Sequence, residues 1–188
     1  MATNLEHLIA IVGMAGSGKG TCSDYLEQNY PVVHFGKMVV EEVEKRELEI
    51  NETNERLVRE DLRRQHGPTV MAILAEQRIA ELSPPHDIII IDGLYSWDEY
   101  KFFEQKYGDR FTVIAVFTPR RDRYERLTKR DYRSLSEEEA KARDVAEIEN
   151  LGKGGPIARA DYTLVNTDTP EALQQRLAEL LETELGIG

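Results

Sequence analysis

The stretch GMAGSGKGT at residues 13–21 restricts the fold of this chain more than any other feature. It lies between an apolar run at 8–12 and a helical pattern at 19–29, the setting of a loop that wraps a phosphate. Glycines let successive backbone N–H groups turn toward a phosphate, and the helix N-terminus adds the positive end of its dipole. A turn that merely connects two elements would not explain Lys19, which would reach the β- and γ-phosphates of a nucleotide. The sequence therefore predicts nucleotide contacts from Gly13, Met14, Ala15, Gly16, Ser17, Gly18, Lys19, Gly20 and Thr21.

Apolar runs of strand length alternate with amphipathic helical patterns along the chain. The runs lie at 8–12, 31–35, 87–92, 111–117 and 161–165. Continuous Ile and Val, without alternation with polar residues, indicate strands that are covered on both faces, and hence a parallel sheet. The helical patterns lie at 19–29, 37–48, 54–66, 69–82, 97–107, 119–130, 136–149 and 170–184. We therefore predict an α/β, three-layer P-loop NTPase fold: a parallel five-stranded sheet with helices on both faces.

Two segments interrupt the alternation of strands and helices. Residues 37–85 place about three helices between the second and third strands, and residues 131–156 add a helical excursion before the last strand. The run from Gly152 to Pro156 is rich in helix breakers and is predicted to be a loop. Since 188 residues suit one core, we expect a single domain over 1–188, with a helical insert and a short lid.

Composition narrows the class of protein. The net charge of −11 argues against a nucleic-acid-binding protein, because phosphate backbones are bound mainly through excess Lys and Arg. No apolar run reaches the ~18 residues of a membrane-spanning helix, and the N-terminus lacks signal-peptide features, so we expect a cytoplasmic protein without membrane contact. The one cysteine, Cys22, excludes an internal disulfide and is predicted to be buried filler.

The glycine that follows Lys19 indicates a branch of P-loop proteins. GTPases and many ATPases have a hydroxyl residue there to bind Mg²⁺, whereas this loop reads G-x-x-G-x-G-K-G-T and resembles nucleoside monophosphate kinases of the adenylate kinase type. The resemblance implies that Thr21 helps to hold the α-phosphate and that Mg²⁺ is held largely through water. It places the carboxylate of that water shell at Asp92, in DIIIIDG, which is also a possible base for an acceptor hydroxyl. A strand-end aspartate can otherwise be a turn residue.

The basic segment at 119–133 contains the R-L-x-x-R element of these kinases as Arg126 and Arg130. By resemblance, one arginine lies against the ATP base and the other pairs with its phosphates, because the planar guanidinium both stacks and binds oxygens in pairs. A solvent-exposed basic helix explains the remaining residues, Arg120, Arg121 and Arg123. The resemblance further implies a lid arginine at Arg143 that closes over the phosphate, and backbone contacts to adenine near Asn166.

Almost the whole chain resembles a group of adenylate-kinase-related proteins often described as dephospho-CoA-kinase-like. The shared landmarks include LRRQHGP, FTVIAVFTPRRDRYERLTKR and IARADYTLVN. The two arginines with which adenylate kinases clamp AMP are missing, because their places fall near Val40 and at Leu94–Ser96. Other residues are therefore expected at the acceptor: His34, Arg63, Arg78, Gly93 and Tyr95. Arg46 and Arg59 of the insert are further candidates for the missing clamp. Ordinary surface arginines and a structural histidine remain the alternatives.

These features predict an ATP- and Mg²⁺-dependent small-molecule kinase that transfers the γ-phosphoryl group to a nucleotide-like acceptor. The catalytic candidates are Lys19, Asp92, Arg126, Arg130 and Arg143. One alternative is a dephospho-CoA kinase that phosphorylates the ribose 3′-hydroxyl, with His34 as base. Another is a regulatory ATP-binding protein or slow ATPase. A switch GTPase is disfavoured because N-K-x-D is missing, and a motor ATPase because Gly93 rather than Glu follows Asp92.

Overall fold

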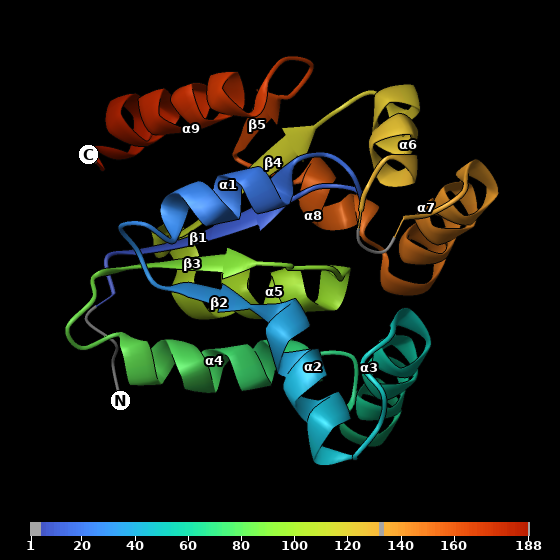
Figure 1. The fold of residues 1–188 in the computed structure, drawn as a ribbon. Coiled ribbons are helices and arrows are strands. Elements are labelled where there is room, and N and C mark those ends of the chain that lie inside the picture. Colours follow the sequence, from blue (N-terminus) through green and yellow to red (C-terminus); the bar gives the residue numbers. More distant parts are fainter. Residues whose placement is uncertain (1–4, 132–133, 188) are drawn as a thin grey trace.

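The computed structural model describes residues 5–131 and 134–187, and its centre is a five-stranded sheet (Figure 1). The strands stand in the order β2-β3-β1-β4-β5, and each neighbouring pair is parallel. Their bounds are β1 His7–Val12, β2 Val32–His34, β3 Ile88–Asp92, β4 Phe111–Phe117 and β5 Tyr162–Val165. The predicted parallel five-stranded sheet is confirmed. Because β1 is central, the loop that follows it lies in the middle of the carboxyl edge of the sheet.

Helices cover both faces of this sheet (Figure 1). α1 and α9 pack on one face, and α4 and α5 on the other, while α3 and α7 stand beyond the carboxyl ends of the strands. The helix bounds are α1 Lys19–Leu26, α2 Phe35–Lys45, α3 Glu52–His66, α4 Val70–Leu82, α5 Trp97–Tyr107, α6 Arg120–Thr128, α7 Glu137–Leu151, α8 Gly154–Ala158 and α9 Pro170–Leu185, with a 3₁₀ turn η1 at Gly108–Arg110.

The uninterrupted apolar strands contribute side chains to two hydrophobic cores, one on each face of the sheet. Along β1, Leu8 and Ala10 face the helices of the insert and α5, whereas Ile9 and Ile11 face α1 and α9. Successive side chains of a strand point to opposite faces, so a strand with helices on both sides needs apolar residues at every position. Cys22 is buried in the second core, as predicted, and burial raises the pKa of its thiol to about 12.

The structure differs from the sequence prediction at two element boundaries. β2 ends at His34 and α2 begins immediately at Phe35, so the predicted strand 31–35 was too long. The predicted loop from Gly152 to Pro156 contains the short helix α8. Pro156 does not prevent this helix, because it lies in the first turn, where a backbone N–H has no intrahelical partner.

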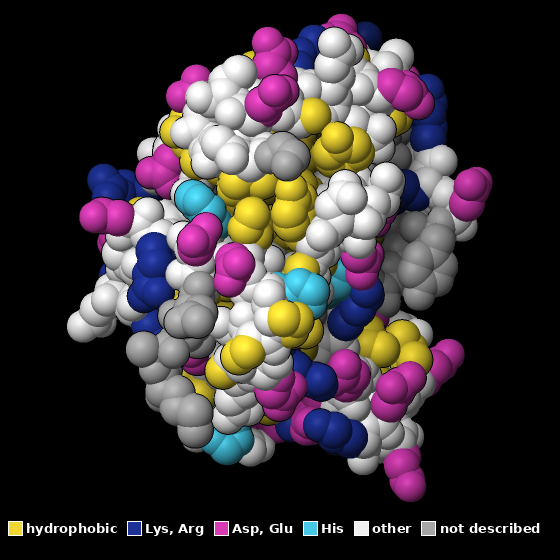
Figure 2. Space-filling view, turned by 90° about the vertical axis from the view of Figure 1, so that its left-hand side faces the viewer, with side chains coloured by type: hydrophobic (Ala, Val, Ile, Leu, Met, Phe, Trp, Pro, Cys, Tyr) yellow, Lys and Arg dark blue, Asp and Glu magenta, His cyan; other side chains and the backbone are white. Residues whose placement is uncertain are grey.

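The surface facing away from the phosphate loop carries a mixture of acidic and basic side chains (Figure 2). Figure 2 views the molecule from the side on which both chain ends lie in Figure 1, and acidic and basic side chains are intermingled there. Over residues 5–131 and 134–187, none of the helices is both long enough and apolar enough to span a bilayer.

Candidate active site

The phosphate-binding loop is strongly curled between β1 and α1. Gly13, Gly16 and Gly18 have φ of 148°, 79° and 103°, backbone conformations that L side chains rarely adopt. The ammonium group of Lys19 folds back over the loop and donates to the carbonyl oxygens of Gly13 at 2.9 Å and Met14 at 3.1 Å. Gly18 occupies the N-cap of α1 and, within the described residues, no side chain caps this helix. The first N–H groups of α1 can therefore serve an anion.

The loop borders a cavity of about 360 Å³, which we call the loop hollow. Burial lowers the pKa of Lys19 to about 7, with a further contribution from the charge of Lys153, while Asp92 and Glu147 act in the opposite direction. The ammonium groups of Lys19 and Lys153 thus disfavour one another here, and an anion between them would stabilise both charges. The hollow is lined by Ala15, Gly16, Gly18, Lys19, Gly20, Thr21, Asp24, Asp92, Tyr95, Arg130, Arg143 and Lys153.

Asp92 ends β3 directly beside His34, the last residue of β2. The strand register pairs these two residues, and Nδ1 of His34 lies 3.0 Å from Oδ2 of Asp92. The hydrogen bond to Asp92 raises the pKa of His34, although partial burial opposes the shift. Nε2 of His34 faces Glu27 at 3.4 Å. His34 is therefore a partner of the carboxylate of Asp92, and it is not among the residues that line the loop hollow or the pocket next to it.

A second cavity, of about 140 Å³, adjoins the loop hollow, and we call it the insert pocket. It shares Tyr95, Arg130 and Arg143 with the loop hollow, so the two cavities meet at these side chains. The helices α2, α3 and α4 of the 37–85 insert form most of its wall. The pocket is lined by Phe35, Gly36, Val39, Glu55, Arg59, Arg63, Met71, Tyr95, Arg130 and Arg143.

Among the acceptor candidates, Arg63 and Tyr95 line the insert pocket. Nη2 of Arg63 donates to Oε1 of the buried Glu99 at 2.8 Å, and its buried Nε has no hydrogen-bond partner among the described residues. Glu99 also accepts from the backbone N–H groups of Tyr95 and Ser96 at 2.9 and 3.0 Å, and so caps α5. Arg63 is thereby tied to the segment that follows Asp92.

Two further acceptor candidates, Arg78 and Gly93, line neither cavity. Arg78 is on α4, half exposed, and pairs with Glu41 at 2.8 Å rather than lining either cavity. Gly93 has φ of 97°, and a side chain there would place its Cβ 2.9 Å from the ring of Tyr95. Gly93 therefore allows the chain to turn so that Tyr95 can point back toward the cavities.

Arg126 and Asn166 lie together on the outer side of the phosphate loop. Arg126 donates to the hydroxyl of Thr118 at 3.3 Å and to the carbonyl oxygen of Asn166 at 3.2 Å. The side-chain amide of Asn166 donates to the carbonyl oxygen of Ser17 at 2.8 Å, and a Cβ on Gly18 would lie 2.2 Å from that amide. The structure thus brings these two candidates together beside the loop, outside the residues that line the loop hollow.

Arg123 does not belong to a solvent-exposed face, contrary to the sequence interpretation. It is 6% exposed and forms a two-pronged ion pair with Asp144 of α7, at 3.0 and 2.5 Å. Its Nη1 also donates to the carbonyl oxygen of Ala15 in the phosphate loop, at 2.9 Å. A basic pattern on an isolated helix could not reveal this role, because the partner carboxylate lies 21 residues further along the chain.

Sequence reasoning did not single out Glu55 and Lys153, two charged residues that line the cavities. On α3, Glu55, Arg59 and Arg63 follow one another at intervals of four, a spacing that puts all three on one helical face and could have identified Glu55. Lys153 lies in the glycine-rich segment that was predicted as a loop, and no pattern distinguished it. It is 2% exposed, and its ammonium group lies 2.6 Å from Oε2 of Glu147.

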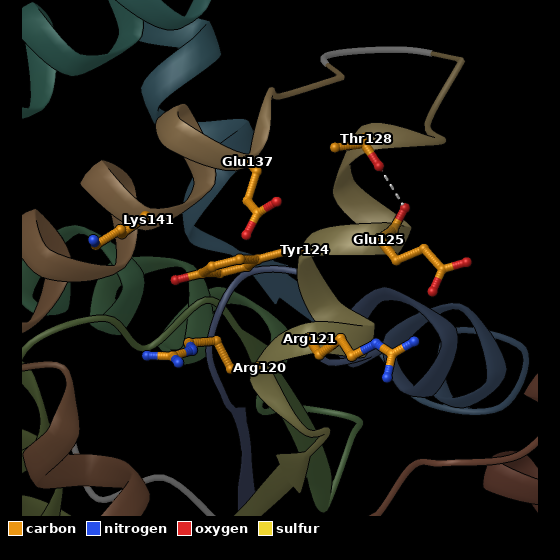
Figure 3. A pocket seen from close by; sticks show the side chains of 7 residues that line it. All are labelled: Arg120, Arg121, Tyr124, Glu125, Thr128, Glu137 and Lys141. Atoms are coloured by element: carbon orange, nitrogen blue, oxygen red, sulfur yellow. Dashed lines mark hydrogen bonds between the residues drawn. The ribbon is translucent and has the colours of Figure 1, made fainter.

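A larger cavity lies elsewhere, between α6 and α7, with a volume of about 600 Å³ (Figure 3). The ring of Tyr124 projects from α6 toward α7, with Glu137 above it and Arg120 below. Apart from Tyr124, its lining side chains are exposed and carry both signs of charge, so it is a groove in the surface rather than a built site. It is lined by Arg120, Arg121, Tyr124, Glu125, Thr128, Glu137 and Lys141.

The parallel sheet, the glycine-rich loop after its central strand and the lysine folded over that loop define a P-loop protein of the nucleoside monophosphate kinase-like class. A family model described as an AAA domain matches residues 9–148, although Gly93 stands where a motor ATPase would carry glutamate. The chain belongs to the UPF0200 family: it is 35% identical over 179 residues to the UPF0200 protein of Thermococcus onnurineus (strain NA1), covering 93% of this chain and 96% of that relative.

A second relative and a solved structure are also similar to this chain. The UPF0200 protein of Hyperthermus butylicus is 35% identical over 184 residues, covering 96% of both chains. Among solved structures, shikimate kinase from Bacteroides thetaiotaomicron superposes with a TM-score of 0.59 at 17% identity, covering 94% of this chain and 98% of that one. The structural likeness shows the shared fold.

Proposed function

We propose that this protein is an ATP-dependent kinase that transfers the γ-phosphoryl group of ATP to a small nucleotide-like acceptor. The observation that carries the proposal is the meeting of the loop hollow and the insert pocket at Tyr95, Arg130 and Arg143. A phosphoryl donor on the loop and an acceptor in the insert pocket would lie side by side. Phosphoryl transfer needs mainly this positioning, together with positive charge around the transferred group.

The residues of the loop hollow fit a nucleotide triphosphate. The curled loop and the uncapped N-terminus of α1 offer N–H groups, and Lys19 adds a cation that already bends over the loop. Arg130 and Arg143 offer guanidinium groups at the boundary between the two cavities, where charge spreads over the transferred group. Arg126 and Asn166, beside the loop, are the candidates for the base.

The residues present also fit Mg²⁺ held through water. Among the described residues no cluster of three or more His, Cys, Asp or Glu side chains could hold a metal directly. Asp92 is the carboxylate at the strand end, and it lines the loop hollow with Lys19. When bound with ATP, the cation would neutralise phosphate charge, and Asp92 would orient its water shell.

The insert pocket constrains the acceptor. Its volume of about 140 Å³ is below the ~300–1,000 Å³ of typical small-molecule sites, so a full nucleotide would need the pocket to open. Its polar lining combines the carboxylate of Glu55 with several guanidinium groups, which suits an acceptor that carries both an anionic group and hydrogen-bond donors. A second candidate function is dephospho-CoA kinase. The contact between His34 and Asp92 favours it, because the histidine can exchange a proton with the carboxylate at the strand edge.

A coupled assay for ADP release tests the proposal. The acceptor panel is nucleoside monophosphates, dephospho-CoA and shikimate, each with Mg²⁺ and ATP, and with water alone as the background. We expect one acceptor class to raise ADP release well above that background, and Lys19→Ala to abolish it. Exposed Lys101→Met on α5 is the matched charge control and should retain the activity. ADP release that no acceptor increases would reject the kinase in favour of a regulatory ATP-binding protein or slow ATPase.

A further inference from the structure

A second lysine enters the loop hollow from the turn between α7 and α8. Lys153 is 2% exposed, and its ammonium group lies 2.6 Å from Oε2 of Glu147 and 4.7 Å from the centre of the Tyr95 ring. Tyr95 is one of the residues at which the loop hollow meets the insert pocket. Lys153 therefore lies at the boundary between the two cavities.

The glycines around Lys153 allow its turn to approach α5 closely. Gly152 ends α7 with φ of 62°, and a Cβ on it would lie 3.2 Å from Cβ of Trp97. A Cβ on Gly155 would lie only 2.6 Å from the Trp97 indole. The indole in turn stacks on Tyr100 with ring centres 5.0 Å apart. The turn is thus pressed against the first residues of α5, and this packing fixes the place from which Lys153 extends.

Among the residues that line the loop hollow, cationic side chains outnumber carboxylates. Oε1 of Glu147 accepts from Arg143 at 3.0 Å while Oε2 faces Lys153, so one carboxylate serves two cations. Four cationic side chains line the loop hollow, against the carboxylates of Asp92 and Asp24. Burying an ammonium group is costly unless opposite charge compensates it, so the boundary between the cavities favours a further anion.

We propose that Lys153 is a second phosphate-binding lysine, whose ammonium group contacts the terminal phosphoryl group of ATP at the boundary between the two cavities. The assignment rests on the proposed function for its donor. During transfer the bond from the γ-phosphorus to the β–γ bridging oxygen breaks, with its electron pair left on ADP, and a bond to the acceptor oxygen forms. Lys153 keeps its proton throughout and stabilises the negative charge on the non-bridging oxygens. A hydroxyl acceptor would pass its proton to Asp92.

Nucleotide binding tests the contact without any acceptor. Titration calorimetry with Mg²⁺ compares the β,γ-imido analogue of ATP with ADP, for the wild type and for Lys153→Met. Loss of one charge-assisted hydrogen bond should weaken analogue binding ~10-fold or more, with ADP binding changed less than ~2-fold. Lys153→Arg should recover most of the difference, because it keeps the charge. Lys141→Met, a change of the same type at an exposed position of α7, should alter neither affinity.

Two results would overturn the assignment: equal weakening of both nucleotides, or no weakening of either. If Lys153→Met does not fold, Lys153→Gln combined with Glu147→Gln removes both buried charges and is compared with Glu147→Gln alone. The same selective loss of analogue binding is expected there, and its absence counts against the contact.

Failure of the proposed kinase would be distinguishable. One outcome is a wild type that turns over no acceptor and still binds the analogue more tightly than ADP, with this preference lost in Lys153→Met. That result would support the phosphate contact of Lys153 and reject the proposed kinase activity. If the acceptor is found, Lys153→Met should lower kcat by ~10²-fold or more with little change in the KM of the acceptor. If Lys153→Met changes neither kcat nor the preference for the analogue over ADP, the phosphate contact of Lys153 is rejected and the proposed kinase activity stands.

Discussion

At the scale of single residues, Gly20 and Lys19 of the phosphate loop differ in their surroundings: Gly20 has free space around it, whereas Lys19 lies near other cations. An added Cβ on Gly20 would meet nothing within 4 Å, so a lack of space does not explain why this position carries no hydroxyl residue. Lys19, by contrast, is partly buried near other cations, and its pKa of about 7 follows from burial first and from Lys153 second. The loop is therefore electrostatically unfavourable without an anion, although its backbone is fully formed.

This conflict predicts a pH dependence of stability. Lys19 titrates near 10.5 when unfolded and near 7 when folded, so between these values the unfolded chain binds more protons. The free energy of unfolding should therefore gain its Lys19 contribution as pH rises from about 7 to about 10, and lose it as pH falls through the same window. Urea unfolding at pH 7, 8.5 and 9.5 should show a steeper rise for the wild type than for Lys19→Met. Parallel curves for the wild type and Lys19→Met would contradict a lowered pKa of Lys19 in the folded protein. The control, exposed Lys101→Met, should follow the wild type.

At the scale of elements, the buried pair of Arg123 and Asp144 joins α6, α7 and the phosphate loop. Arg123→Met would leave the carboxylate of Asp144 buried without its main partner, which typically costs about 3–5 kcal/mol of folding stability. Adding Asp144→Asn should recover part of that loss, because the remaining group is uncharged. Urea denaturation measures both variants, with exposed Arg121→Met as the control. A loss below about 1 kcal/mol for Arg123→Met would show that α6 and α7 do not depend on the pair.

The attachment of α9 to the sheet depends on apolar packing. Leu177 is fully buried between α1 and the strands, so Leu177→Ala should lower the free energy of unfolding by about 2–5 kcal/mol. Leu57, on α3, is 51% exposed, and the same truncation there should change stability by less than about 0.5 kcal/mol. Denaturant titration of the two variants gives the comparison. Equal losses would mean that α9 is not held by its buried face.

At the scale of the whole molecule, the sheet and the loop were predictable because their signals are local. Unbroken Ile and Val runs indicate strands that are buried on both faces, and the glycine spacing indicates a loop whose backbone has positive φ angles. The walls of the cavities were less predictable, since they depend on which distant side chains meet. The partnership of Arg123 with Asp144 and the entry of Lys153 are set by how α7 and α8 pack, which no single segment encodes.

The prediction of one domain can be decided by unfolding. Val43, Val58 and Met71 of the insert share one core with Leu8 and Ile89 of the sheet, so the insert should not unfold separately. The small cluster between α6 and α7, around Tyr124 and Leu127, is separate from that core. Because Trp97 contacts the α7–α8 turn, its fluorescence reports on α7 and α8, whereas far-UV circular dichroism reports on all helices. We expect the two urea transitions to coincide, with Lys101→Met behaving as the wild type. An earlier fluorescence transition would show that α7 and α8 unfold before the sheet.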